Sequence, residues 1–178
     1  TRVMWKRYMD MCGEIDEEIT VPELVKEGSL CPHQDFVYFN YPTEEEQFTI
    51  YRRVAEKMAG KKTVIRTLDM GADKQADYLQ LEEEDNPALG YRGIRILLTK
   101  TELFKAQLRA IYRAAAYGRL AVLYPMIISG EEVEKIRLIT TQVKEELTAE
   151  GITFGQVEEG IMIETPAAVM ISDELAKE

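Results

Sequence analysis

The sequence predicts an α/β fold with a parallel sheet, and three observations in residues 42–178 lead to this prediction. Helical and strand-like patterns alternate along this part of the chain, as they do in βαβ units. The run Leu120-Ala121-Val122-Leu123-Tyr124 is almost continuously apolar, which is typical of a parallel strand buried on both faces. Thr43 and Ser129 each stand three residues before a glutamate, the spacing of a capping box at a helix N-terminus.

The first clear helix is expected over 44–58. Thr43 and Glu46 form its capping box, in which each side chain accepts a hydrogen bond from the other residue's backbone N–H. Apolar residues then recur at helical spacing as far as Met58, and Gly60 can end the helix.

A strand, a loop and a second helix follow in order. Segment 63–68 is short and rich in β-branched residues, which favours a strand. Residues 71–88 are polar and read as a loop, and 91–98 is compatible with either a short helix or a strand. A helix is expected over 101–117, where apolar residues lie on one side.

The pattern after the apolar strand repeats the same alternation. Ser129 and Glu132 have capping-box spacing and predict a helix that runs to about Ala149. A third strand is expected over 157–163, and Thr165-Pro166 then has the residue types of an N-cap and first helical position.

Composition sets limits on the function. The chain has 178 residues, which favours one domain, and its net charge of −10 argues against nucleic acid as a partner. No stretch of about 18 apolar residues occurs, so no membrane-spanning segment is expected. Cys12 and Cys31 do not have zinc-site spacing, and they are expected to be reduced thiols of a cytoplasmic protein.

Candidate site residues follow the predicted strands, because sites of parallel α/β folds lie at the carboxyl ends of strands. These candidates are Arg66 and Asp69 at the end of the first strand, Pro125 and Met126 at the end of the second, and Glu164 at the end of the third. Arg92 and Arg95 come shortly after Gly90 and add positive charge.

The chemistry of these residues fits an anionic substrate and a metal ion. Arginine binds phosphate or carboxylate through two hydrogen bonds, so Arg66 and Arg92 suit a ligand that carries both groups. Glu164 suits Mg²⁺, which takes one or two protein carboxylates together with phosphate oxygens. This combination points to phosphoryl transfer.

Each candidate also has a structural alternative. Arg66 could belong to an ion pair on the strand, and Glu164 could cap the following helix. Asp69 could be a solvated loop residue, and Arg92 and Arg95 could be surface arginines of a helix.

Five segments resemble Enzyme I, the phosphoenolpyruvate–protein phosphotransferase of the sugar phosphotransferase system. They occur in the order and at the spacing of that family, and the resemblance covers roughly residues 42–178. The segments are Pro-Thr-Glu-Glu-Glu-Gln-Phe at 42–48, Val-Ile-Arg-Thr-Leu-Asp at 64–69, Asn-Pro-Ala-Leu-Gly-Tyr-Arg-Gly-Ile-Arg at 86–95, Tyr-Pro-Met-Ile at 124–127 and Gly-Ile-Met-Ile-Glu-Thr-Pro-Ala-Ala at 160–168.

The resemblance implies a (β/α)₈ TIM barrel that binds phosphoenolpyruvate (PEP) and Mg²⁺. It implies that Arg66 and Arg92 bind the substrate and that Glu164 binds the metal ion, with no catalytic residue in this chain. The family's enzyme is a cytoplasmic homodimer. It passes the phosphoryl group to a histidine on a separate N-terminal domain and then to the carrier protein HPr.

The sequence also departs from the family. Residues 1–35 do not resemble its first strand and helix, and His33 stands where its second strand carries an arginine. Gly71-Ala72-Asp73-Lys74 replaces a Gly-Gly-Asp-Lys loop. The expected organisation is therefore a divergent, unassigned segment over 1–35 and a partial PEP-binding TIM barrel over 36–178.

About half of the barrel is expected in this chain. The family's Asn-Asp motif, a later arginine and the catalytic cysteine lie beyond Glu178, so the chain alone is expected to be inactive. Two other readings stay open. One is a non-catalytic dimerisation or binding module, and the other is a barrel piece of a pyruvate phosphate dikinase or PEP synthase relative. The Thr43–Phe48 opening argues against the latter.

Overall fold

The computed structural model describes residues 41–58, 60–72, 79 and 81–177. The helices and strands, in chain order, are α3 (Glu44–Lys57), β1 (Thr63–Arg66), α4 (Ile94–Thr99), α5 (Thr101–Ala114), the 3₁₀ turn η1 (Ala115–Tyr117), β2 (Leu120–Tyr124), α6 (Gly130–Ala149), β3 (Val157–Ile161), α7 (Pro166–Met170) and α8 (Ser172–Leu175). The predicted segment 1–35, with His33 and both cysteines, lies outside the described residues.

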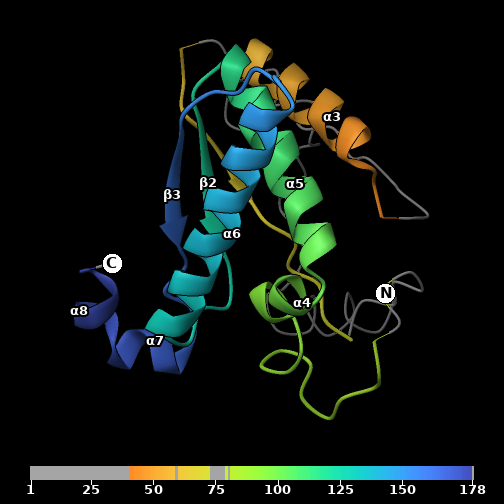
Figure 1. Cartoon of the computed structure of the whole chain (residues 1–178). Coiled ribbons are helices and arrows are strands. Elements are labelled where there is room, and N and C mark those ends of the chain that lie inside the picture. Colours follow the sequence, from red (N-terminus) through yellow and green to blue (C-terminus); the bar gives the residue numbers. More distant parts are fainter. Residues whose placement is uncertain (1–40, 59, 73–78, 80, 178) are drawn as a thin grey trace, which may run out of the picture. The chain divides into compact units, whose positions relative to one another are not determined.

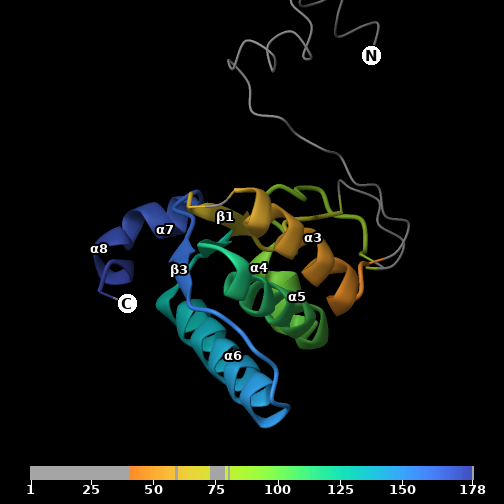
Figure 2. The same ribbon diagram turned by 90° about the horizontal axis from the view of Figure 1, so that it is seen from above.

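The three strands form a parallel sheet in the order β1-β2-β3, so the α/β prediction is confirmed. The register pairs Val64 with Ala121 and Ala121 with Glu158. Helices α5 and α6 lie against the same face of this sheet, and α3 packs beside α5 (Figures 1 and 2). The strands therefore have a helix-covered face and an opposite face.

The apolar core lies between the sheet and these helices. Ile65, Val122 and Tyr124 point from the strands to this side, where they pack with Phe104 and Ile111 of α5. Side chains alternate along a strand. Val64 therefore points to the opposite face, where it is 53% exposed.

The predicted element boundaries hold closely, with a few differences. The sequence of segment 91–98 is compatible with a helix or a strand, and the structure has a helix here, α4 over Ile94–Thr99. The first strand ends at Arg66 instead of residue 68, and the third ends at Ile161 instead of residue 163. Beyond these ends each strand makes one more backbone hydrogen bond to β2, from Thr67 to Leu123 and from Met162 to Tyr124.

The two predicted capping boxes have different outcomes. Thr43 and Glu46 form the complete reciprocal pair at the start of α3. At α6 the Ser129 hydroxyl accepts from the N–H of Glu132, as predicted, but the Glu132 carboxylate accepts from the N–H of Ile128 at 2.7 Å. The second capping box is therefore half formed, and Glu132 fixes the segment that enters the helix.

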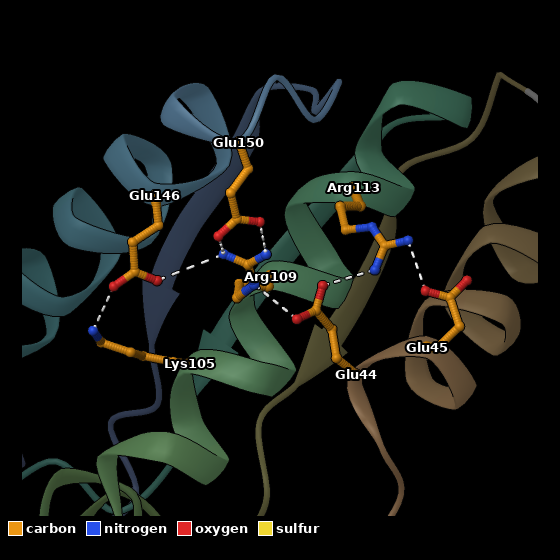
Figure 3. Close-up of polar contacts among 7 residues, drawn as sticks. All are labelled: Glu44, Glu45, Lys105, Arg109, Arg113, Glu146 and Glu150. Carbon is orange, nitrogen blue, oxygen red and sulfur yellow. Dashed lines mark hydrogen bonds and ion pairs between the residues drawn. The ribbon is translucent and has the colours of Figure 1, made fainter.

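Charged side chains join the three helices of the outer layer. Arg109 of α5 donates to both carboxylate oxygens of Glu150 on α6, and its Nε lies 2.7 Å from Glu44 on α3 (Figure 3). Arg113 donates to Glu44 and Glu45 at the N-terminus of α3. Acidic residues at a helix N-terminus are also favoured by the helix dipole.

A second polar group connects the helices to the sheet. Glu159 of β3 accepts hydrogen bonds from the hydroxyls of Tyr112 and Tyr124, at 2.6 and 3.0 Å. Lys144 of α6 lies 3.1 Å from the same carboxylate. Burial, together with the neighbouring Glu159 charge, raises the pKa of both tyrosines well above the usual value of 10.

None of the helices in the described ranges is both long enough and apolar enough to cross a lipid bilayer.

Candidate active site

The candidate site lies at the carboxyl ends of the three strands. Helices α4 and α7 lie at this end of the sheet (Figure 1). Arg66 is the last residue of β1, and the segments that follow β1, β2 and β3 carry Asp69, Met126 and Glu164 respectively. The predicted placement of these residues at the ends of the strands is therefore found in the topology.

The segment after β1 is anchored on both sides. The N–H of Thr67 donates to the carbonyl of Leu123 at 3.1 Å and continues the sheet pairing by one bond. The N–H of Leu68 donates to the side chain of Gln107 at 3.0 Å, and Gln107 is itself buried in α5. These two bonds fix the backbone from which Asp69 projects.

Asp69 brings the two predicted substrate arginines together. Its Oδ1 lies 3.0 Å from Nε of Arg92, and its Oδ2 lies 3.5 Å from Nη1 of Arg66. The Asp69 side chain is only 7% exposed. The reading of Asp69 as a solvated loop residue is therefore wrong, whereas the ion-pair reading of Arg66 is right in part.

The two arginines differ in accessibility. The side chain of Arg66 is 50% exposed, while that of Arg92 is 15% exposed. Arg92 stands just before α4, and its neighbour Gly93 is tied to the β1 loop by a hydrogen bond from its N–H to the carbonyl of Met70. Arg66 is thus the more open of the two cations.

Gly93 is required at its position for two reasons. Its φ of 55° lies in the region that favours glycine. A Cβ at this position would also lie 3.0 Å from Cγ of Met126 and 3.1 Å from Oδ1 of Asp69. The absence of a side chain lets the β1 loop, the β2 loop and the start of α4 approach one another.

Glu164 reaches back to the loop after β2. Its Oε1 accepts a hydrogen bond from the backbone N–H of Met126 at 2.7 Å. The cap of α7 is the next residue, Thr165, whose hydroxyl accepts from the N–H of Ala168 and donates to the carbonyl of Ile127. The alternative reading of Glu164 as a helix cap is therefore wrong.

Met126 has an unusual backbone. Its φ is 62°, the only positive value for a residue other than glycine in the described part of the chain. A methionine in this conformation is uncommon. The sequence pattern Tyr-Pro-Met-Ile gave no sign of it, because positive φ is normally predicted only at glycine, asparagine or aspartate.

Arg95 was predicted as a second candidate cation after Gly90. Its guanidinium donates to the carbonyls of Leu89 and Gly90 and so holds the loop before α4. Glu84 accepts from the N–H of Tyr91 in the same loop. These contacts give Arg95 a structural role in shaping the approach to Arg92.

The residues at this edge fit a Mg²⁺ ion that takes most of its ligands from substrate and water. No group of three or more His, Cys, Asp or Glu side chains that could hold a metal occurs among the described residues. Glu164 offers one carboxylate, oriented by its bond to Met126. Asp69 is occupied by the arginines. One protein carboxylate with substrate oxygens is an arrangement that Mg²⁺ accepts.

Comparison with known proteins agrees with the family resemblance found in the sequence. Residues 34–178 match the family model described as PEP-utilising enzyme, PEP-binding domain. The chain is 51% identical over 138 residues to a phosphoenolpyruvate–protein phosphotransferase of Haemophilus influenzae, an alignment that covers 77% of this chain and 24% of the relative.

Two further relatives carry the same name. The chain is 45% identical over 178 residues to the protein of Staphylococcus aureus, covering 96% of this chain and 31% of that relative. It is 45% identical over 148 residues to the protein of Bacillus subtilis, covering 81% and 26%. The chain therefore spans between 24% and 31% of the length of these curated relatives.

Proposed function

Because the chain belongs to the family of PEP-utilising enzymes, in the region of their PEP-binding domain, we propose that it forms part of the PEP site of a phosphoenolpyruvate–protein phosphotransferase. The observation that carries this proposal is the pair of arginines, Arg66 and Arg92, on one buried aspartate at the carboxyl end of a parallel sheet. Glu164 follows another strand at the same edge.

The proposed substrate explains why cations gather here in an acidic protein. PEP carries a phosphate and a carboxylate, and the chain as a whole has a net charge of −10. Local arginines must therefore supply the attraction. Arg66, being half exposed, is proposed to bind the phosphate, and Arg92 is proposed to bind a second anionic group of the same molecule.

Glu164 is proposed to hold Mg²⁺. When bound, the ion would neutralise negative charge that develops on substrate oxygens during phosphoryl transfer. The residues of this chain contribute by binding and orienting: the arginines hold the substrate, and the Met126 N–H fixes the direction of the Glu164 carboxylate. No residue of this chain is proposed as the phosphoryl acceptor.

In the proposed reaction the phosphoryl group leaves the enol oxygen of PEP and bonds to a histidine nitrogen of the parent protein. The P–O bond breaks, the P–N bond forms, and the enolate takes up a proton to become pyruvate. HPr would receive the phosphoryl group next. The sequence of 178 residues contains one histidine. Because that residue, His33, lies outside the family's acceptor motif, we expect no PEP-dependent transfer from this chain alone.

A partial (β/α)₈ barrel is the architecture that we propose for the region 36–178. Three neighbouring parallel strands with helices on one face are what a section of barrel wall would contain. The exposed Val64 on the other face would then point to the barrel interior. A cytoplasmic homodimer is proposed from the family resemblance. A non-catalytic binding module is not favoured, since the relatives are named as transferases.

Calorimetric titration of PEP with Mg²⁺ tests the proposal. We expect the intact protein that carries this chain to bind PEP, and Arg66→Ala to abolish that binding. Arg53→Ala is the matched control, because Arg53 is an exposed arginine on α3. Equal binding by Arg66→Ala and Arg53→Ala would overturn the assignment of Arg66.

A further inference from the structure

We infer that Asp69 is a positioning residue for the PEP site, and that its carboxylate sets the spacing of Arg66 and Arg92. This inference rests on the proposed function and deepens it. The two arginines contact opposite oxygens of one carboxylate, at 3.5 Å for Arg66 and 3.0 Å for Arg92. Their separation is therefore set by a carboxylate whose side chain is itself buried.

Electrostatics explains why the pair needs such a group. Two guanidinium ions that approach one ligand repel each other before the ligand arrives. A carboxylate between them offsets this repulsion, and the arginines in turn stabilise a carboxylate that is 7% exposed. Each charge in the group therefore offsets the others.

The two contacts are unequal, and this difference has a consequence. The Arg92 side chain is mostly buried, and its Nε–H donates to Asp69. This hydrogen bond fixes the orientation of the Arg92 guanidinium. Arg66 is half exposed and makes the longer contact. We expect Arg92 to be held in one orientation and Arg66 to adjust when the ligand binds.

The backbone around Asp69 supports this role. The hydrogen bond from Leu68 to Gln107 fixes the residue before it. Gly93 approaches Asp69 so closely that a Cβ would lie 3.1 Å from Oδ1. The carboxylate is thus confined by packing as well as by charge, which is what a positioning residue requires.

The test compares three variants of the intact protein. Asp69→Asn keeps the shape and removes the charge, Asp69→Glu keeps the charge and lengthens the side chain, and Asp173→Asn is the control on the exposed face of α8. Two quantities are measured: the dissociation constant for PEP with Mg²⁺, and the hydrogen-exchange rate of the Arg92 Nε–H by nuclear magnetic resonance without ligand.

We expect Asp69→Asn to weaken PEP binding roughly 10- to 100-fold, by analogy with the loss of an outer-shell partner at a metal site, and to speed Arg92 Nε–H exchange. Asp69→Glu is expected to weaken binding as well, because charge without the correct spacing is insufficient. A role in charge balance alone predicts that Asp69→Glu binds like the wild type, and that result would overturn the inference.

The outcomes also separate this inference from the proposed function. If the wild-type protein binds no PEP, the proposed function fails, whatever the exchange rates show. If the wild type binds PEP and Asp69→Asn binds it equally well, the positioning role fails and the proposed function stands. Circular dichroism of each variant confirms that the comparison is made between folded proteins.

Discussion

The carboxylate of Glu164 accepts a hydrogen bond from the backbone N–H of Met126, over a distance of 2.7 Å. This bond joins the segment after β3 to the segment after β2. It depends on the backbone of Met126, whose φ is 62°. A side chain proposed to bind a metal ion is therefore oriented by a residue in an uncommon conformation.

The conformation of Met126 can be tested with two isomeric side chains. Met126→Ile introduces a branch at Cβ, which is strongly disfavoured at positive φ, whereas Met126→Leu does not. We expect Met126→Ile to be less stable than Met126→Leu by about 1–3 kcal/mol. Urea denaturation measures this difference.

The same pair of variants tests the orientation of Glu164. Mn²⁺ serves as a paramagnetic probe for the proposed Mg²⁺ site, and its affinity is measured by electron paramagnetic resonance. We expect Met126→Ile to bind Mn²⁺ more weakly than Met126→Leu. Equal affinities would show that the Met126 N–H does not orient the carboxylate.

Gly93→Ala is expected to destabilise the protein by about 1–3 kcal/mol, because it combines positive φ with close contacts to Met126 and Asp69. Gly130→Ala is the control, since a Cβ at Gly130 would meet no atom within 4 Å. Gly130 is in the first turn of α6, where alanine is expected to be neutral or slightly stabilising. The melting temperatures of both variants test this prediction, and only Gly93→Ala is expected to melt at a lower temperature than the wild type.

The ion pair between Arg109 and Glu150 predicts a dependence of stability on acid pH. The hydrogen bond from Arg109 lowers the pKa of Glu150 below its usual value of 4.5. The pair therefore stabilises the folded state fully above pH 4.5, and the effect is lost as the pH falls through the lowered pKa.

Glu150→Gln measures this effect. We expect its melting temperature to lie below that of the wild type at pH 7, and the gap to close as the pH falls below 4.5. Glu145→Gln, an exposed change on the same helix, is the control. A gap that stays constant down to pH 3 would contradict the prediction.

Tyr112 and Tyr124 predict a dependence at alkaline pH. Burial raises the pKa of both phenols above 10, so their protonated forms stabilise the folded state below pH 10 and the stabilisation is lost as the pH rises further. We expect their ionisation, followed by absorbance at 295 nm, to coincide with unfolding followed by circular dichroism.

Phenylalanine variants show how much each tyrosine contributes to the change in absorbance at 295 nm. Tyr112→Phe and Tyr124→Phe should each reduce the part of the absorbance change that coincides with unfolding. Ionisation of either residue at a pH well below that at which circular dichroism is lost would contradict this prediction. It would show that solvent reaches the hydroxyls of Tyr112 and Tyr124 in the folded protein.

The helices and strands of residues 42–178 could be predicted because their signals are local. The β2 run and the Thr43 cap depend on neighbours within a few positions, and both occur as predicted. Strand ends were less certain, because residues such as Leu68 and Ile163 have strand-forming side chains but no aligned partner strand. Only the assembled sheet decides where pairing stops.

The site could be predicted by its residue types but not by its contacts. Arg66 and Arg92 were identified through their positions and a family resemblance, and their roles remain proposals. The Asp69 contact with Arg92 joins residues 23 positions apart. The hydrogen bond from Met126 to Glu164 spans 38 positions. Neither contact can be predicted from spacing, since both follow from which segments become neighbours in the fold.

The ion-paired residues of the helix layer (Figure 3) include none of the residues at the strand ends, which are joined by their own contacts. Substitutions in separate, non-contacting sets tend to have additive effects. An engineer could therefore change Arg109, Arg113 and their partners to raise the thermal stability without changing any residue of the proposed PEP site. In the same way, natural variation in the outer helices could accumulate while ligand recognition is retained.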